Sequence, residues 1–177
     1  DATRNSRDAA LIAVAWDSGA RSGELRALTI GDVADHHHGL QITVDGKTGQ
    51  RSVTLIPSVP YLRRWLDDHP APDEPDAPLW SKLTAPEEIV YQQFRKSLRQ
   101  AAKRAGVTKP VTLTNFRKSQ AAYLASRGMN QANIERRLGW THGSDVTRHY
   151  VQVFAEEADH ELAKIHGKNV ESDNPES

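Results

Sequence analysis

Two short stretches of alternating apolar and polar residues constrain the fold of this chain more than any other feature. Residues 39–44 (Gly-Leu-Gln-Ile-Thr-Val) and 51–56 (Arg-Ser-Val-Thr-Leu-Ile) alternate as β-strands do. Between them lies Asp45-Gly-Lys-Thr-Gly, a sequence that is typical of a tight turn. We therefore expect an antiparallel β-hairpin, with a third short strand before it around residues 32–35.

The rest of the chain has the apolar spacing of helices. The predicted helices are residues 6–17, a short helix from Ser22, 61–69, 86–105, 112–127, 130–138, a short helix carrying Tyr150, and 155–165. Residues 70–78 contain four prolines and three acids, which indicates a surface loop. The aromatic residues expected in the core are Trp16, Trp65, Phe94, Phe116 and Tyr123. The predicted fold class is mainly α with a small antiparallel β-sheet.

The composition excludes several kinds of protein. A chain of 177 residues with 37% hydrophobic and 26% charged residues fits one globular domain. No apolar run reaches the roughly 18 residues of a membrane span, and no secretory signal pattern is present. The sequence has no cysteine, which removes disulfides, thiolate nucleophiles and cysteine-based zinc sites. We expect a cytoplasmic protein, associated with the nucleoid or, if viral, in the host cell cytoplasm, and no membrane partner.

The formal net charge is zero, but the charges are unevenly distributed. No acid occurs between Ile89 and Ile134. The basic residues of that span are Arg95, Lys96, Arg99, Lys103, Arg104, Lys109, Arg117, Lys118 and Arg127. Such a basic stretch fits a surface that faces phosphates, and it fits a solvated helix face equally well. The charge pattern alone leaves both interpretations open.

Four separated segments carry residues with catalytic potential. Arg21 follows Ser18-Gly-Ala at a loop-to-helix junction, with Glu24 one turn later, and Lys47 stands at the tip of the predicted hairpin. Arg117 lies in the first turns of a helix, in Leu113-Thr-Asn-Phe-Arg-Lys-Ser. Tyr150 ends a segment that opens with Leu138-Gly-Trp. Taken singly, each of these residues is interpreted more simply as a surface, solvated or core residue.

Taken in order, these segments resemble the catalytic domain of the tyrosine recombinases, the phage integrase family. The most specific matches are Gly19-Ala-Arg-Ser-Gly-Glu-Leu and Leu138-Gly-Trp with its following His149-Tyr-Val, and the hairpin Lys47-Thr-Gly-x-x-Arg-x-Val-x-Leu is moderately specific. The resemblance extends over about residues 6–165. The Trp-x-x-Gly-Ser form is most similar to archaeal members. The resemblance implies the DNA breaking-rejoining enzyme fold, and it implies site-specific recombination without metal, ATP or cofactor.

The resemblance also implies a role for each residue. Arg21 and Arg117 clamp the non-bridging oxygens of one phosphate, since guanidiniums bind such oxygens bidentately and keep their charge. Tyr150 attacks the phosphorus and forms a 3′-phosphotyrosine. Lys47 protonates the leaving 5′ oxygen as general acid. Trp140 donates an additional hydrogen bond to the phosphate.

Some positions depart from the family pattern. Thr114 stands three residues before Arg117, where the family usually has histidine, and threonine donates a hydrogen bond but is no base near neutral pH. His142, in the loop after Trp140, is expected to donate a hydrogen bond that compensates for these departures. The residue that accepts the tyrosine proton is left open. Glu24 is expected to support the arginines. The residues expected on the DNA-binding face are Arg95, Lys96, Arg99, Lys103 and Lys118.

The expected partner is double-stranded DNA, with tetramer formation on recombination sites in the full-length protein. We expect residues 1–166 to form the catalytic domain and residues 167–177 a polar, flexible tail. An N-terminal DNA-clamping domain is expected outside this chain, so the chain alone should bind DNA weakly. The run His36-His37-His38 lacks the spacing of a metal site, and no metal is expected.

Three other functions remain open from the sequence. A type IB topoisomerase-like enzyme would share the chemistry but relax supercoils. A DNA-binding module with impaired catalysis is favoured by Thr114. A scaffold protein without a DNA role would require the four segments to coincide by chance.

Overall fold

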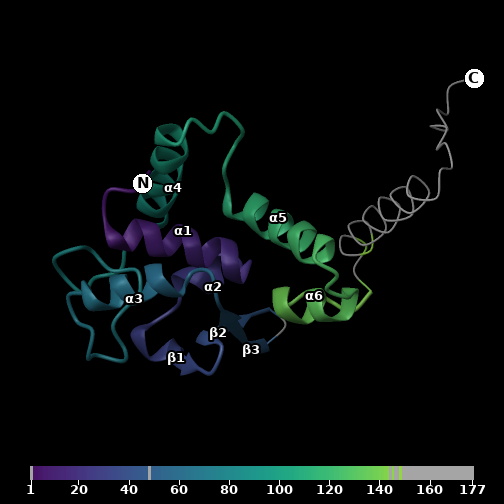
Figure 1. The fold of residues 1–177 in the computed structure, drawn as a ribbon. Helices are drawn as coiled ribbons and strands as arrows, with labels where there is room; N and C mark the ends of the chain where they lie inside the picture. Colours follow the sequence, from purple (N-terminus) through teal and green to yellow (C-terminus); the bar gives the residue numbers. More distant parts are fainter. Residues whose placement is uncertain (1, 48, 144, 146–147, 149–177) are drawn as a thin grey trace, which may run out of the picture.

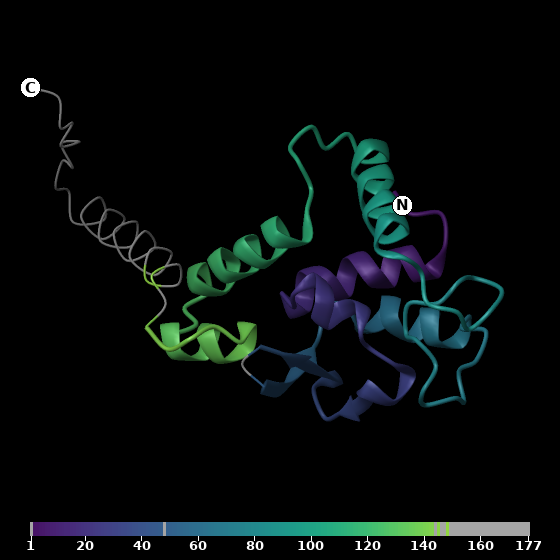
Figure 2. The same ribbon diagram turned by 180° about the vertical axis from the view of Figure 1, so that it is seen from behind.

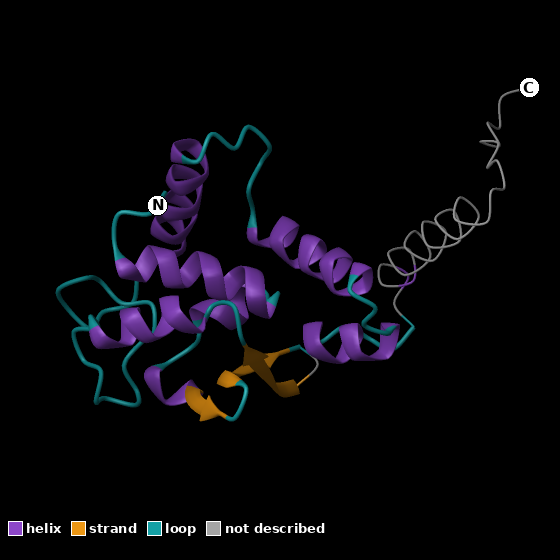
Figure 3. Ribbon diagram, in the orientation of Figure 1, coloured by secondary structure: helices purple, strands orange, loops and turns teal. Residues whose placement is uncertain are grey.

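The computed structural model describes residues 2–47, 49–143, 145 and 148. Its elements in order are α1 (Ser6–Ser18), α2 (Ser22–Arg26), the 3-10 turn η1 (Ile30–Asp32), β1 (Val33–His36), β2 (Gly39–Gly46), β3 (Gly49–Leu55), α3 (Val59–Asp67), α4 (Tyr91–Arg104), α5 (Leu113–Ser126) and α6 (Gln131–Leu138) (Figure 1). The predicted fold class, mainly α with a small antiparallel sheet, is confirmed (Figure 3). Tyr150, the helix predicted at 155–165 and the tail at 167–177 lie outside the described residues.

The sheet is an antiparallel meander in the order β1-β2-β3. Leu40 pairs with Leu55 and Ile42 with Val53, and all four side chains are buried on the same face. The alternation that predicted the hairpin therefore fixes its register, because a slip by one residue would expose this face. Gly46 and Gly49 form the last pair of the ladder, which places Lys47 at the tip of the hairpin, as predicted.

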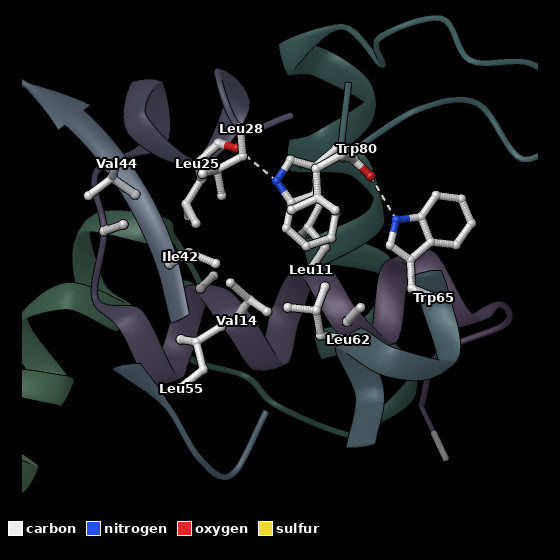
Figure 4. Packing of buried hydrophobic residues seen from close by; sticks show 14 of the residues in the cluster. Leu11, Val14, Leu25, Leu28, Ile42, Val44, Leu55, Leu62, Trp65 and Trp80 are labelled. Carbon is white, nitrogen blue, oxygen red and sulfur yellow. Dashed lines mark hydrogen bonds between the residues drawn. The ribbon is translucent and has the colours of Figure 1, made fainter. Parts of the chain in front are cut away.

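The core surrounds α1, which packs against α3, α4 and α5. Leu11 and Val14 of α1 are fully buried among Leu62 of α3 and the inner face of the sheet. Two buried indoles complete this core, and each N–H donates to a backbone carbonyl at 2.7 Å, as buried indoles require (Figure 4). Trp65 donates to the carbonyl of Leu79, and Trp80 to that of Leu25.

The turn after α1 positions Arg21, one of the catalytic candidates. Gly19 ends the helix in the left-handed conformation, with φ of 57°. A Cβ atom at this position would overlap the side chain of Leu138 in α6, so glycine also permits the close approach of that helix. The chain then extends through Arg21, which is the N-cap residue of α2.

Helices α5 and α6 form a small second cluster. Ala121, Ile134 and Leu138 are buried there, with Trp140 packed beside them. Figures 1 and 2 show this helix pair on the side of the molecule away from α3, with α6 next to the hairpin. None of the helices in the described ranges combines the length and the hydropathy of a membrane span.

Three expectations from the sequence are wrong. Helix α4 begins at Tyr91 rather than at residue 86, because Ile89 donates its N–H to the carbonyl of Trp80 at 3.0 Å and so pairs the preceding residues as an extended segment. Tyr123 is 43% exposed rather than in the core, with its ring beside Trp16. His69, expected in an exposed stretch, is buried because its ring nitrogens bond at 3.1 Å to the carbonyl of Pro78 and the N–H of Ala71.

Candidate active site

Three arginines from three different elements meet at the C-terminal end of α6. The last carbonyls of a helix have no partner within the helix and carry a partial negative charge, so they attract cations. The carbonyl of Arg137 accepts from Nε of Arg51 at 3.1 Å, and that of Gly139 accepts from Nη2 of Arg21 at 2.9 Å. The carbonyl between them, of Leu138, accepts from Nη2 of Arg117. Helix α6 thus orients all three guanidiniums.

Glu24 lies between two of these arginines. Its carboxylate, 3% exposed, accepts from the backbone N–H and Nη1 of Arg21, both at 2.7 Å. It also accepts from Nη1 and Nη2 of Arg51 at 3.0 and 2.8 Å. Burial alone would raise the pKa of Glu24, but the hydrogen bonds from Arg51 and Arg21 lower it to about 2. Glu24 is therefore ionised near neutral pH.

Arg117 is the most deeply buried of the three arginines, at 8% exposed. Its Nη1 donates to the carbonyl of Gly19 at 2.7 Å, and its guanidinium lies 5.1 Å from the ring centre of Trp140. Burial and the positive charge of Arg21 lower the pKa of Arg117 to about 10, while Glu24 acts in the opposite direction. The two guanidiniums predicted to clamp one phosphate are therefore close enough to repel each other.

The charges of this cluster do not balance. Arg21, Arg51 and Arg117 contribute three positive charges and Glu24 one negative charge, which leaves an excess of two among these four side chains. Desolvated excess charge is unfavourable without a counterion. An anion that enters the cluster would relieve this repulsion, and a phosphodiester is such an anion.

A groove of about 1080 Å³ runs between α4, the connection after it and α5. Arg21, Thr114 and Arg117 line this groove, so three of the predicted catalytic residues share one cavity. Of the predicted DNA-binding residues, those that line the same groove are Arg95, Arg99 and Lys103. Lys96 on α4 and Lys118 on α5 are exposed but do not line it.

The tip of the hairpin lies beside the arginine cluster. Gly46 packs directly against the Glu24 carboxylate, so closely that a Cβ atom at this position would overlap Oε1. Lys47 is the next residue, and its side chain is exposed. The position of Gly46 therefore brings Lys47 to the neighbourhood of Arg21 and Glu24.

The segment after α6 carries the remaining candidates. Glu135 of α6 is buried and accepts hydrogen bonds from the backbone of Gly143 at 3.1 Å and from Gln131 at 2.8 Å. Nδ1 of His142 lies 3.2 Å from the same carboxylate, while the His142 ring is 91% exposed. Glu135 thus fixes the turn that follows Trp140.

No role was predicted for Arg51, Gly139 or Glu135 from the sequence. Arg51 is part of the hairpin motif, and its pairing with Val44 follows from the turn, but its distance to Glu24 depends on how the hairpin sits on α2. The carbonyls of α6 leave no signal in the sequence at all. Among the residues that the structure describes, no group of three or more histidines, cysteines or acids is arranged to hold a metal ion.

The fold is shared with solved recombinases. The structure titled XerA recombinase has a TM-score of 0.73 and 25% identity, covering 94% of this chain and 58% of that one. The XerH site-specific recombinase in a post-cleavage complex with a palindromic difH substrate has a TM-score of 0.70 and 20% identity, covering 89% and 45%. The pre-cleavage complex of XerH with a difH substrate has a TM-score of 0.68 and 22% identity, covering 87% of this chain and 45% of that one. The chain thus spans about half the length of these proteins.

No protein with a curated description matches this sequence significantly. The profile described as "Phage integrase family" matches residues 1–157. This range contains all four segments, from Arg21 through Lys47 and Arg117 to Tyr150, and it covers most of the chain. The chain therefore belongs to the phage integrase family.

Proposed function

We propose that this chain is the catalytic domain of a site-specific DNA recombinase, which breaks and rejoins DNA through a covalent phosphotyrosine at Tyr150. The observation that carries the proposal is the convergence of Arg21 and Arg117 in one groove with excess positive charge. Phosphoryl transfer depends mainly on positioning and on neutralising the charge of the phosphate. Two guanidiniums held by backbone carbonyls supply both.

The proposed reaction exchanges one phosphodiester for another. Arg21 and Arg117 hold the non-bridging oxygens while the phenolic oxygen of Tyr150 forms a bond to phosphorus. The bond from phosphorus to the 5′ oxygen breaks, and Lys47 gives its proton to that oxygen. The same steps in reverse rejoin the DNA, so the energy of the broken bond is kept in the 3′-phosphotyrosine.

Four further residues complete the proposed site. Thr114 offers a hydroxyl in the groove, and the indole N–H of Trp140 offers a second neutral donor. His142 is our candidate for accepting the tyrosine proton, because donation from Nδ1 to Glu135 leaves Nε2 as the accepting nitrogen. Glu24 keeps Arg21 and Arg51 in place through its hydrogen bonds to both.

We propose double-stranded DNA as the partner, with the groove-lining residues Arg95, Arg99 and Lys103 on the phosphates that flank the cleaved one. Contacts of this kind position a protein on DNA without reading its sequence. Assembly as a tetramer on recombination sites and a cytoplasmic location complete the proposal.

The experiment that tests it is a selection for covalent capture. The chain is incubated with duplexes of randomised sequence that carry a nick, so that a cleaved fragment diffuses away and the adduct accumulates. We expect adducts that survive detergent and are lost in Tyr150→Phe, whereas adducts of equal yield from Tyr150→Phe would reject the proposal.

The captured sequences then separate the related functions. Joining of two captured sites supports recombination, while relaxation of a supercoiled plasmid without joining supports the topoisomerase-like function. Sequence-selective binding with no adduct supports a binding module with impaired catalysis, the function that Thr114 favours.

A further inference from the structure

We infer that Arg51 is a positioning residue of this site, which fixes Arg21 through Glu24 and through the C-terminal end of α6. The inference deepens the proposed function and rests on it for the catalytic consequence, whereas the positioning itself is a property of the folded chain.

The first route from Arg51 to Arg21 is the shared carboxylate. Arg51 binds both oxygens of Glu24, so it fixes the plane of the carboxylate as well as its place. Oε1 of Glu24, so oriented, accepts from Nη1 of Arg21 at 2.7 Å. Without Arg51, the carboxylate loses two hydrogen bonds and keeps those from the backbone N–H and Nη1 of Arg21. The carboxylate and the Arg21 guanidinium are then held less tightly.

The second route is the end of α6. Nε of Arg51 donates to the carbonyl of Arg137 at 3.1 Å. Its Nη1 lies so close to Gly139 that a Cβ atom there would be 2.7 Å away. The carbonyl of Gly139 accepts from Nη2 of Arg21 at 2.9 Å. Arg51 therefore sets the position of both acceptors that hold Arg21.

Arg51 itself is poorly placed to touch a substrate. Its side chain is 11% exposed, and Nε, Nη1 and Nη2 each donate to the carbonyl of Arg137 or to Glu24. It lies on β3 opposite Val44 of β2, in the hairpin that carries Lys47. A change at Arg51 could thus reach the reaction through Arg21 or through Lys47, and the test must separate the two.

The chain offers a closely matched control. The Arg7 side chain is also 11% exposed, and it binds one carboxylate, Asp8, and one backbone carbonyl, that of Ser81. Neither partner belongs to the arginine cluster. Arg7→Met therefore removes a comparable set of bonds and reports any effect that comes from general loss of stability.

The first measurement is the rate at which the guanidinium protons of Arg21 exchange with water, by NMR with ¹⁵N-labelled arginine. We expect exchange about tenfold faster in Arg51→Met than in the native chain, and unchanged in Arg7→Met. Arg51→Lys keeps the positive charge but lacks the guanidinium that binds both carboxylate oxygens, so its exchange rate should be intermediate. This variant replaces Arg51→Met in the measurement if Arg51→Met does not fold. Unchanged exchange in both Arg51 variants, or an equal change in Arg7→Met, would overturn the inference.

The second measurement is the single-turnover rate of adduct formation on a captured duplex, with oxygen or sulfur as the leaving atom. A thiolate leaves without a proton, so sulfur rescues a defect that acts through Lys47 but not one that acts through Arg21. We expect Arg51→Met to slow both reactions about 100-fold, with DNA affinity changed by less than about threefold. Full rescue by sulfur would overturn the route through Arg21.

Failure of the proposed function would look different. The native chain would then form no adduct with any duplex, while the exchange of the Arg21 protons would still decide whether Arg51 positions that side chain.

Discussion

Arg51 and Glu24 face each other in a two-pronged ion pair, with Nη1 3.0 Å from Oε1 and Nη2 2.8 Å from Oε2. The pair joins β3 to α2, and the guanidinium of Arg51 binds both oxygens of the carboxylate, whereas that of Arg21 binds Oε1. Around it, the carbonyls of α6 hold Arg21 and Arg117. The arrangement explains how a groove with excess positive charge keeps a defined geometry.

Replacement of Glu24 tests the ion pair through pH. Because the pKa of Glu24 in the folded chain is about 2, below its ordinary value of 4.5, its ionised form stabilises the fold above about pH 4.5. This contribution, about 3 kcal/mol, is lost as the pH falls from about 4.5 to about 2. We expect Glu24→Gln to be less stable at neutral pH and to lose less stability over that interval, as measured by urea unfolding.

A parallel acid dependence in Glu24→Gln and in the native chain would contradict this assignment. Glu88→Gln is a suitable control, because its carboxylate is 46% exposed and pairs with Arg26 on the surface.

Anions should stabilise the chain through the excess charge of the cluster. At equal ionic strength we expect sulfate to raise the melting temperature above its value in chloride by about 2–4 °C. The difference should be smaller in Arg117→Met, since one of the two clamping charges is then missing and only the general stabilisation by sulfate remains. A sulfate effect of the same size in that variant would place the anion elsewhere.

Gly139 should tolerate a side chain less well than a comparable glycine. Gly139→Ala brings a methyl group against the Arg51 guanidinium at a φ of 62°, whereas Gly128 has a φ of 82° with nothing within 4 Å. We expect Gly128→Ala to cost about 1 kcal/mol from backbone strain alone, and Gly139→Ala about 1–2 kcal/mol more. Urea unfolding of the two variants measures the difference, and equal costs would show that the approach of Arg51 is unimportant.

Two otherwise similar lysines should differ in their contribution to DNA binding, because only one of them lines the groove. Lys103 lines the groove and Lys118 does not, although both are exposed on helices. We expect Lys103→Gln to weaken DNA binding and to reduce the slope of log affinity against log salt by about one. Lys118→Gln should leave the slope unchanged, so equal effects of the two would show that DNA does not follow the groove.

The sequence predicted what short-range patterns determine. The alternation around Asp45 placed the hairpin, its turn and Lys47 correctly. The resemblance to the tyrosine recombinases, rather than any local pattern, singled out Arg21 and Arg117. Prediction from the sequence failed where single hydrogen bonds outside the regular pattern decide. The start of α4 depends on the pairing of Ile89 with Trp80, and the burial of His69 depends on its bonds to neighbouring backbone.

The same distinction explains what was missed in the site. Arg51 acts through Glu24 and through a backbone carbonyl of α6, and a carbonyl has no residue type by which a sequence could reveal it. Predicting that contact requires the angle between the hairpin and α6, which only the packing of the whole chain sets.

The central claim is that Arg21 and Arg117 bind one phosphate together. The most direct measurement is a titration with inorganic phosphate that follows the guanidinium signals of both arginines by NMR, at constant ionic strength. We expect the two signals to shift with the same midpoint, and each shift to be lost when the other arginine is replaced by methionine. Separate midpoints, or a shift of one arginine that survives loss of the other, would contradict the account.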